Sequence, residues 1–390
     1  MVARLSDIGS VMSSDIELHR PLIGQQGSRR ALNTPVLVIE RAALDHNIAA
    51  MAAFAEAAGV ALRPHAKTHK SADIAKLQIA AGAVGVCCAK LGEAEALAEQ
   101  GVDGILITSP VVTPQAIARL AALNARMKSL QVVADNPANV DALAAAALKT
   151  GRTLTVLVDV DPGIRRTGVA SAEAAVAPAQ QIMTSERLRL GGVQFYCGVQ
   201  QHIESYADRR AAIAERTGYL RSVIEALRGA GIEPGLITGG GTGTHRIDVE
   251  LGVFTELQVG SYVFMDRQYN ECDLAGSAAA PFETALLIEA HVISANSASM
   301  GTIDAGFKAM ATDGGSPAIV SGAPAGAKFV FMGDEHGAVI APGHTFHIGD
   351  TVTLAAPHCD PTVNLYDAYH VVHGDALIDI WPVTARGRSR

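Results

Sequence analysis

The chain has 390 residues, a net charge of −8, 49% hydrophobic residues and only 18% charged ones. This length exceeds one ordinary domain, so we expect one large domain and a smaller one. The acidic balance without a long basic run argues against nucleic-acid binding, and no stretch reaches the ~18 consecutive apolar residues of a membrane-spanning helix.

The N-terminal segment, residues 1–33, carries acidic residues and lacks the long apolar region of a signal peptide. We expect it to form an extended arm. The cysteines have no zinc-type spacing, which is typical of reduced thiols in a cytoplasmic protein. They are Cys87, Cys88, Cys197, Cys272 and Cys359.

From residue 35 onward, short apolar runs alternate with helix-like segments. "PVLVI" comes first, and Leu44, Ile48, Met51 and Phe54 then recur on one helical face. Eight further runs between residues 61 and 264 are typical of buried parallel strands. They are "ALRPHA", "GVCCA", "GILITS", "LQVVAD", "LTVLVDVD", "LGGVQFYCG", "GLITGG" and "ELQVGSYVF". This pattern predicts a (β/α)8 TIM-type barrel over residues 34–274.

The pattern changes after about residue 275. Short β-rich runs punctuated by Gly, Pro and Asp follow one another to the C-terminus, as in "KFVFMG", "AVIAPG" and "HTFHIGDTVTLAAPH". Such runs predict antiparallel strands joined by turns. We therefore expect a C-terminal antiparallel β-domain over residues 275–390.

Unusual polar residues follow the predicted strands, at the barrel face where catalytic groups lie. Lys67, in "RPHAKTHK", follows the first strand, Arg166 the fifth, and Tyr196 and His202 the sixth. A lone lysine on a loop is more often only solvated, but the imidazoles beside this one favour a functional role. Lys70 is the competing lysine, which we expect to begin the next helix and point outward.

A glycine run follows the seventh strand, in "TGGGTGT" (238–244). Closely spaced backbone N–H groups without Cβ obstruction suit a phosphate, and this is the usual phosphate position of a barrel. A flexible turn is the commoner cause of such a run. A lysine facing a phosphate across a barrel indicates a Schiff base with pyridoxal 5′-phosphate (PLP). Arg166 would then keep the pyridine nitrogen unprotonated, and a structural salt bridge is the alternative role for this residue. Tyr196 would stack on the ring or form a hydrogen bond near it, or would only fill the barrel.

A second group of polar residues lies in "PHCDPTVNLYD" (357–367). In an extended strand, His358 and Asp360 would face one side and Cys359 the other. One imidazole and one carboxylate, completed by water, suit Mn²⁺, Mg²⁺ or Zn²⁺. Most such pairs bind nothing, so a structural role is the alternative.

Together these motifs resemble those of D-threonine aldolase-like enzymes, from about residue 34 to the C-terminus. The motifs, in the family's order, are "RPHAKTHK", "GGGTGT", "ELQVGSYVFMD", "TIDAGFK", "DEHG" and "HCDPTVNLYD". The family consists of fold-type III PLP enzymes with an alanine racemase-like barrel and a C-terminal β-domain. The resemblance implies that Lys67 forms the Schiff base and that His202 takes the proton of the substrate hydroxyl. The implied metal ligands are His358 and Asp360, and the implied cofactor contacts are Arg166, Tyr196, Thr238, Gly240, Gly241, Thr242, Gly243, Ser261 and Tyr262.

The function we expect is cleavage of D-3-hydroxy-α-amino acids of the D-threonine type to glycine and an aldehyde. The expected cofactors are PLP and a divalent metal, Mn²⁺ or Mg²⁺ first and Zn²⁺ second. A homodimer is expected from the fold, with the β-domain of one subunit capping the barrel of the other.

Alternatives remain open at this point. They are a 3-hydroxy-D-aspartate aldolase, a D-serine or 3-hydroxyaspartate dehydratase, a racemase, a PLP carrier without turnover and a non-catalytic barrel. Asp360 stands where the related dehydratases have a cysteine, which favours the aldolase. The chain also departs from many relatives at Cys197, Arg267 and Tyr366; Arg267 either binds a second substrate carboxylate or is solvated.

Overall fold

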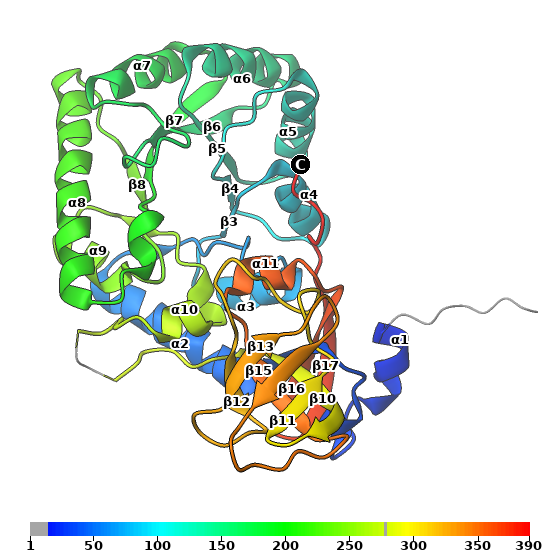
Figure 1. Ribbon diagram of the computed structural model, residues 1–390. Coiled ribbons are helices and arrows are strands. Elements are labelled where there is room, and N and C mark those ends of the chain that lie inside the picture. Colours follow the sequence, from blue (N-terminus) through cyan, green and yellow to red (C-terminus); the bar gives the residue numbers. More distant parts are fainter. Residues whose placement is uncertain (1–14, 277–278) are drawn as a thin grey trace, which may run out of the picture.

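Two sheets organise the computed structural model, which describes residues 15–276 and 279–390. Figure 1 shows a curled sheet ringed by helices in its upper part and a β-rich domain below it. Eight described strands form the curled sheet, each parallel to its neighbours. In spatial order they are β2 (Ala61–Leu62), β9 (Glu256–Leu257), β8 (Leu236–Gly239), β7 (Leu188–Phe195), β6 (Leu154–Val160), β5 (Leu130–Ala134), β4 (Ile105–Ile107) and β3 (Val86–Cys88).

The two edges of this sheet meet just beyond β2. His65 and Cys87 form a parallel bridge, and the amide of Ala66 donates to the carbonyl of Cys87 at 2.7 Å. The eight strands are those that the apolar runs predict, and the expected barrel with its parallel strand order is confirmed.

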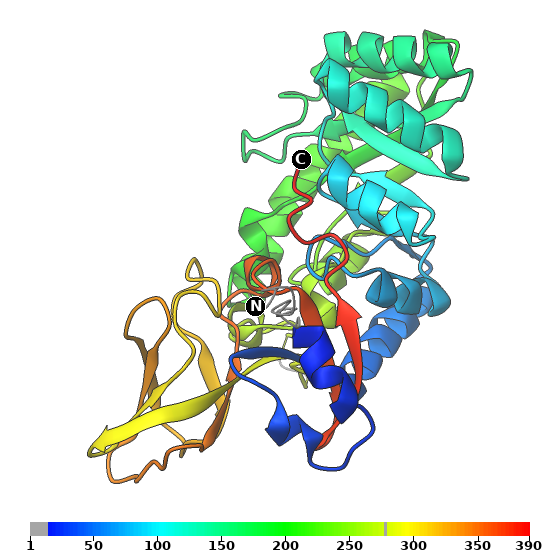
Figure 2. The same ribbon diagram turned by 90° about the vertical axis from the view of Figure 1, so that its right-hand side faces the viewer.

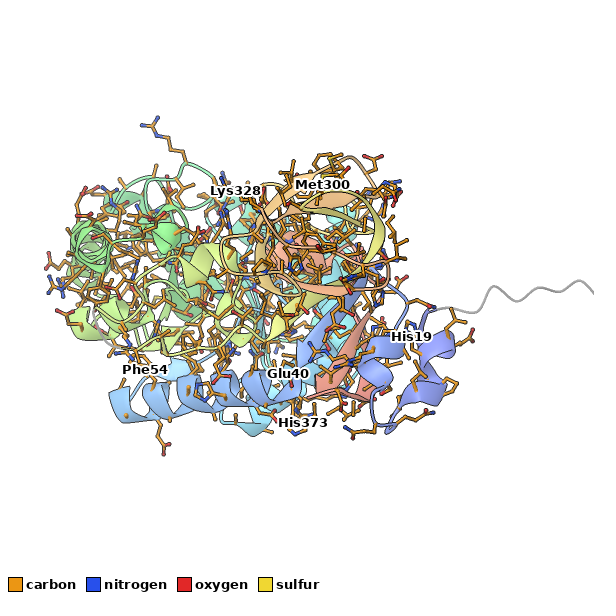
Figure 3. All side chains as sticks on the ribbon, turned by 60° about the horizontal axis from the view of Figure 1, so that its bottom comes forward. His19, Glu40, Phe54, Met300, Lys328 and His373 are labelled. Carbon is orange, nitrogen blue, oxygen red and sulfur yellow. The ribbon has the colours of Figure 1, made fainter. Side chains whose placement is uncertain are left out.

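Helices surround the barrel on its outer side (Figure 1). They are α2 (Arg41–Ala58), α3 (Ala72–Ala80), α4 (Leu91–Glu99), α5 (Pro114–Arg126), α6 (Pro137–Thr150), α7 (Val176–Thr184), α8 (Tyr206–Gly229) and α9 (His245–Leu251). Several begin at side chains that bind the first free amides of the helix: Ser71 accepts from Ile74, and Thr113 from Ala116. Helix α2 buries the predicted face and runs along one side of the molecule, between Glu40 and Phe54 in Figure 3.

The C-terminal domain is a mostly antiparallel sheet, as the sequence predicts. Its central path is β13-β14-β11-β10-β1-β16-β17, with β15 pairing to both β10 and β12. The strands are β10 (Leu286–Ser297), β11 (Met300–Ile303), β12 (Ala318–Ser321), β13 (Lys328–Phe331), β14 (Gly337–Ile340), β15 (Thr351–Ala355), β16 (Ala368–His373) and β17 (Ala376–Pro382). In the view of Figure 3, Met300 and Lys328 lie on the opposite side of the molecule from α2.

One strand of this sheet precedes the barrel in the chain. β1 (Val36–Glu40), the "PVLVI" run, pairs antiparallel with β10 and parallel with β16. This pairing could not be predicted from the sequence, because an apolar run can belong to either sheet. β1 therefore ties the chain before the barrel to the chain after it.

The described part of the predicted arm is not extended. It consists of α1 (Asp15–His19) and the 3-10 turns η1 (Arg20–Leu22) and η2 (Ser28–Ala31). These turns lie beside β17 (Figure 2), where the amide of Gly24 donates to the carbonyl of Leu377 at 2.8 Å. Residues 1–14 of the arm lie outside the described residues. In the described parts of the chain, no helix is both long enough and apolar enough to cross a membrane.

Candidate active site

A cavity of about 350 Å³ opens at the carboxyl ends of the barrel strands, where the C-terminal domain meets the barrel. Side chains that the sequence singles out in both domains line it together. They are Lys67, Arg166, Tyr196, His202, Gly241, Thr242, Ser261, His358 and Asp360. The residues predicted at the strand ends of the barrel therefore line the same cavity as His358 and Asp360.

Lys67 and Asp360 form an ion pair across the domain boundary. Lys67 Nζ donates to the Asp360 carboxylate, with the lysine side chain 36% and the aspartate side chain 13% exposed. Burial works against the charged forms of both groups, but their mutual attraction outweighs it: the pKa of Lys67 is raised, and that of Asp360 lowered, from the ordinary values. The lysine of the barrel is therefore held directly against the C-terminal domain.

Lys70 lies elsewhere, and the expectation that it points outward is wrong. It has a left-handed backbone conformation (φ 48°), is buried, and donates to Glu93. The second oxygen of Glu93 accepts the amides of Ala89 and Lys90 at the start of α4. Lys70 therefore supplies the cation for this buried carboxylate, and α3 begins two residues later at Ala72, after its N-cap residue Ser71. Lys67 is thus the lysine that faces the cavity.

His202 ends the short 3-10 turn η4 (Val199–His202) and lines the cavity. Its ring centroid lies 4.4 Å from that of Tyr269 and 6.4 Å from that of His358. Among the described residues, its Nε2 finds no hydrogen-bond partner. Burial, and then the neighbouring His358, lowers the pKa of His202. A neutral imidazole with a free ring nitrogen therefore stands beside the cavity.

The His-x-Asp motif does not lie on a strand, which corrects the expected geometry. His358 is the extended residue before helix α11 (Cys359–Val363), and Asp360 lies in its first turn. The buried carboxylate of Asp266 accepts the amide of Cys359 at 2.8 Å and thereby fixes the start of this helix. His358 and Asp360 nevertheless both line the cavity, and Cys359 is fully buried behind them.

These two residues fit a metal ion in one particular way. His358 Nδ1 lies 2.7 Å from Asp313 Oδ2, which leaves Nε2 as the nitrogen available to a ligand. An imidazole oriented by a carboxylate is typical of metal-binding histidines. Within residues 15–276 and 279–390, no group of three or more His, Cys, Asp or Glu side chains forms a metal cluster. Any ion bound by His358 and Asp360 would therefore have two protein ligands and would need water to complete its coordination.

The predicted phosphate cradle is only partly at the cavity. Gly241, Thr242 and Ser261 line it, together with Gly260. Thr238 is instead buried against Glu256, and the hydroxyl of Tyr262 accepts from Gln78. Gly240 and Gly243 lie behind the cradle, where a Cβ would meet the carboxylate of Asp248 at 2.4 Å and the backbone of Gln201 at 2.0 Å respectively. The glycine run thus serves packing as well as the cavity.

Arg166 and Tyr196 also line the cavity, Arg166 from the loop after β6 and Tyr196 from the end of β7. Burial raises the pKa of the Tyr196 phenol, so the ring is neutral. Lys67, the hydroxyls of Thr242 and Ser261, and the glycines beside them fit a phosphorylated aldehyde such as PLP.

Sequence reasoning missed several residues of this site, among them two glutamines. Gln258 lines the cavity, and Gln201 braces both the glycine run and the turn that carries His202. Gln258 Nε2 donates to Gln194, which in turn donates to Asp159 at 2.9 Å in the barrel interior. Inward-facing polar residues on predicted barrel strands were the available signal, because glutamine carries no motif of its own.

Comparison with known proteins follows the same division of the chain. Residues 39–268 match the family described as "Alanine racemase, N-terminal domain", and residues 285–372 match "Putative serine dehydratase domain". Two relatives are similar over 92% of this chain: the 3-hydroxy-D-aspartate aldolase of Paracoccus denitrificans (strain Pd 1222), 37% identical over 93% of its length, and the D-threonine aldolase of Arthrobacter sp, 39% identical over 94% of its length.

The chain belongs to the D-threonine aldolase-like family of carbon–carbon lyases. The solved D-threonine aldolase of Filomicrobium marinum has a similar structure, with a TM-score of 0.88 and 36% identity over 92% of this chain and 97% of that one. PLP is the cofactor expected of this family. The family resemblance that the motifs indicated is thereby confirmed.

Proposed function

We propose that this protein is a PLP- and divalent-metal-dependent aldolase that cleaves D-3-hydroxy-α-amino acids to glycine and an aldehyde. The observation that carries the proposal is the contact of Lys67 with Asp360 beside His358 and His202 in one cavity. The similarity to aldolases over nearly the whole chain supports it.

Each group at the cavity has a task in this reaction. Lys67 would hold PLP covalently, and Gly241, Thr242 and Ser261 would hold its phosphate; when bound, PLP supplies the sink for the electron pair left on Cα. His358 and Asp360 would hold the metal, which supplies acidity to a hydroxyl oxygen beside it. The contact between Lys67 and Asp360 would break when the two groups bind, because Lys67 would then be bonded to PLP and Asp360 to the metal.

Cleavage of the bond between Cα and Cβ requires removal of the proton on the β-hydroxyl. His202 is suited to accept it, because its Nε2 carries no other hydrogen bond within the described structure and its pKa is lowered. Tyr269, packed against its ring, holds the imidazole in place. His202 is therefore proposed as the general base.

The substrate is proposed to carry an uncharged group on Cβ, as D-threonine does. Arg267 is the residue that could bind a second substrate carboxylate. Its Nη2 donates to the carbonyl of Gly314, and its Nε lies 3.6 Å from Oε1 of Glu271. Its guanidinium therefore serves the fold. Ile164, Val199 and Tyr269 give the cavity an apolar side where a methyl or larger group fits. This favours D-threonine over 3-hydroxy-D-aspartate.

A homodimer is part of the proposal. Large apolar side chains are exposed on the C-terminal domain, including Phe307, Val330 and Met332. Light scattering on the purified protein tests this assignment.

The test of the function is a product balance with D-threonine and the PLP-loaded protein. We expect equal amounts of glycine and acetaldehyde, abolished by EDTA and restored by Mn²⁺, and a lower kcat/KM for 3-hydroxy-D-aspartate. Release of ammonia and a keto acid would instead identify a dehydratase and contradict the role given to Asp360.

A further inference from the structure

The segment 309–314 of the C-terminal domain is fastened to the helix that carries the proposed metal ligands. The hydroxyl of Tyr366 donates to the carbonyl of Ala309 at 2.7 Å. The amide of Ala311 donates to Thr362 Oγ1 at 3.0 Å, and that hydroxyl donates to the carbonyl of His358 at 2.7 Å. Two side chains from α11 and the residues after it thus fix the start of the segment.

The other end of the segment is held from the barrel side. Arg267, in helix α10 (Arg267–Asn270), donates through Nη2 to the carbonyl of Gly314. Gly314 lies so close to the chain before His358 that an added Cβ would stand 2.9 Å from the carbonyl oxygen of Pro357. The segment is therefore pressed against residues 357–358 and braced by an arginine.

Asp313 lies between these attachments and makes the remaining contact. Its Oδ2 lies 2.7 Å from His358 Nδ1, and its side chain is 56% exposed. An exposed pair of this kind adds little to the stability of a fold. It does favour one state of the imidazole. With Nδ1–H donating to the carboxylate, Nε2 keeps its lone pair, and a rotated ring would lose this hydrogen bond.

We propose that Asp313 is a positioning residue for metal binding, which holds His358 in the tautomer and orientation that present Nε2 to the ion. Arg267 and Tyr366 are positioning residues one step further out, since they hold the segment that carries Asp313. The inference rests on the proposed metal-dependent function. It also gives Arg267 and Tyr366 a shared role.

The test is a titration of metal-free, PLP-loaded protein with Mn²⁺, following the free ion by electron paramagnetic resonance. Asp313→Ala is expected to raise the dissociation constant about 10–100-fold, as loss of a carboxylate behind a metal-binding histidine typically does. Asp313→Asn keeps a carbonyl oxygen that can accept from Nδ1–H, so its rise is smaller. Arg267→Met and Tyr366→Phe raise the constant less than Asp313→Ala.

The matched control is Asp367→Ala. This change also removes an exposed carboxylate, but one that is paired with Arg386 and not with a proposed metal ligand. It changes the net charge equally and should leave the Mn²⁺ affinity unchanged. The cofactor absorbance and the unfolding temperature of each variant separate positioning from damage to the fold: Asp313→Ala should change neither.

Two results would contradict different statements. An Asp313→Ala protein that binds Mn²⁺ as tightly as the wild type overturns the inference and leaves the proposed function standing. A wild-type protein that binds Mn²⁺ no better than His358→Ala overturns the metal site itself, and the inference with it.

Discussion

The lysine that does not face the cavity provides a sharp test of the structure. Lys70 and Glu93 form an ion pair with side chains 8% and 4% exposed. Lys70→Met removes the cation and leaves a buried carboxylate without its charge partner. We expect a large loss of stability from this change and no loss of the cofactor site.

The size of the loss follows from the burial. Breaking a buried ion pair by removing one partner costs about 3–5 kcal/mol, because the remaining charge stays desolvated. At about 2.1 cal/mol/K of unfolding entropy per residue, a chain of this length should then unfold about 4–6 °C lower. Arg228→Met in the exposed pair with Glu233 is the control, and should leave the unfolding temperature nearly unchanged.

The assay is thermal unfolding by circular dichroism, read beside the absorbance of the lysine-bound cofactor. Lys70→Met should unfold early and keep the absorbance, and the double variant with Glu93→Gln should recover part of the lost stability. The reasoning is refuted if Lys70→Met is no less stable than Arg228→Met, or if it folds normally and loses the cofactor absorbance.

Three further changes test other parts of the structure. His202→Phe should lower kcat about 10²–10⁴-fold while cofactor binding is retained; unchanged turnover in a steady-state assay would remove His202 as the base. Gly260→Ala places a Cβ 2.8 Å from Thr68 Oγ1 and should weaken PLP binding about tenfold in a fluorescence titration. An unchanged affinity would contradict a role for Gly260 in the cofactor site. Burial lowers the pKa of His245 to about 4, below the ~6.5 of an unfolded chain, so the unfolded state binds more protons and the free energy of unfolding falls as the pH drops from about 6.5 to 4. His245→Phe should therefore move the acid-unfolding midpoint, measured by circular dichroism, to lower pH. An unchanged midpoint would show that protonation of His245 does not contribute to acid unfolding.

The barrel could be predicted because its signals are local. Each strand is a short apolar run, and helices such as α3 and α5 begin at a Ser or Thr that binds the first turn. The residues after each strand then meet at one face, so Lys67, Arg166 and His202 could be grouped before any coordinates were known.

What could not be predicted depends on partners far along the chain. The start of α11 is fixed by Asp266, more than 90 residues earlier, and so the motif around His358 could not be distinguished from a strand. Lys70 turns inward because Glu93 lies in another helix. Likewise β1 joins the C-terminal sheet through strands at the opposite end of the sequence.

The most direct test of the central claim is reduction of the PLP-loaded protein with borohydride, followed by mass mapping of the labelled peptide. The account predicts the cofactor mass on Lys67 and its loss from that peptide in Lys67→Ala. A label on Lys70, or a protein that carries no labelled lysine after loading with PLP, would contradict the account.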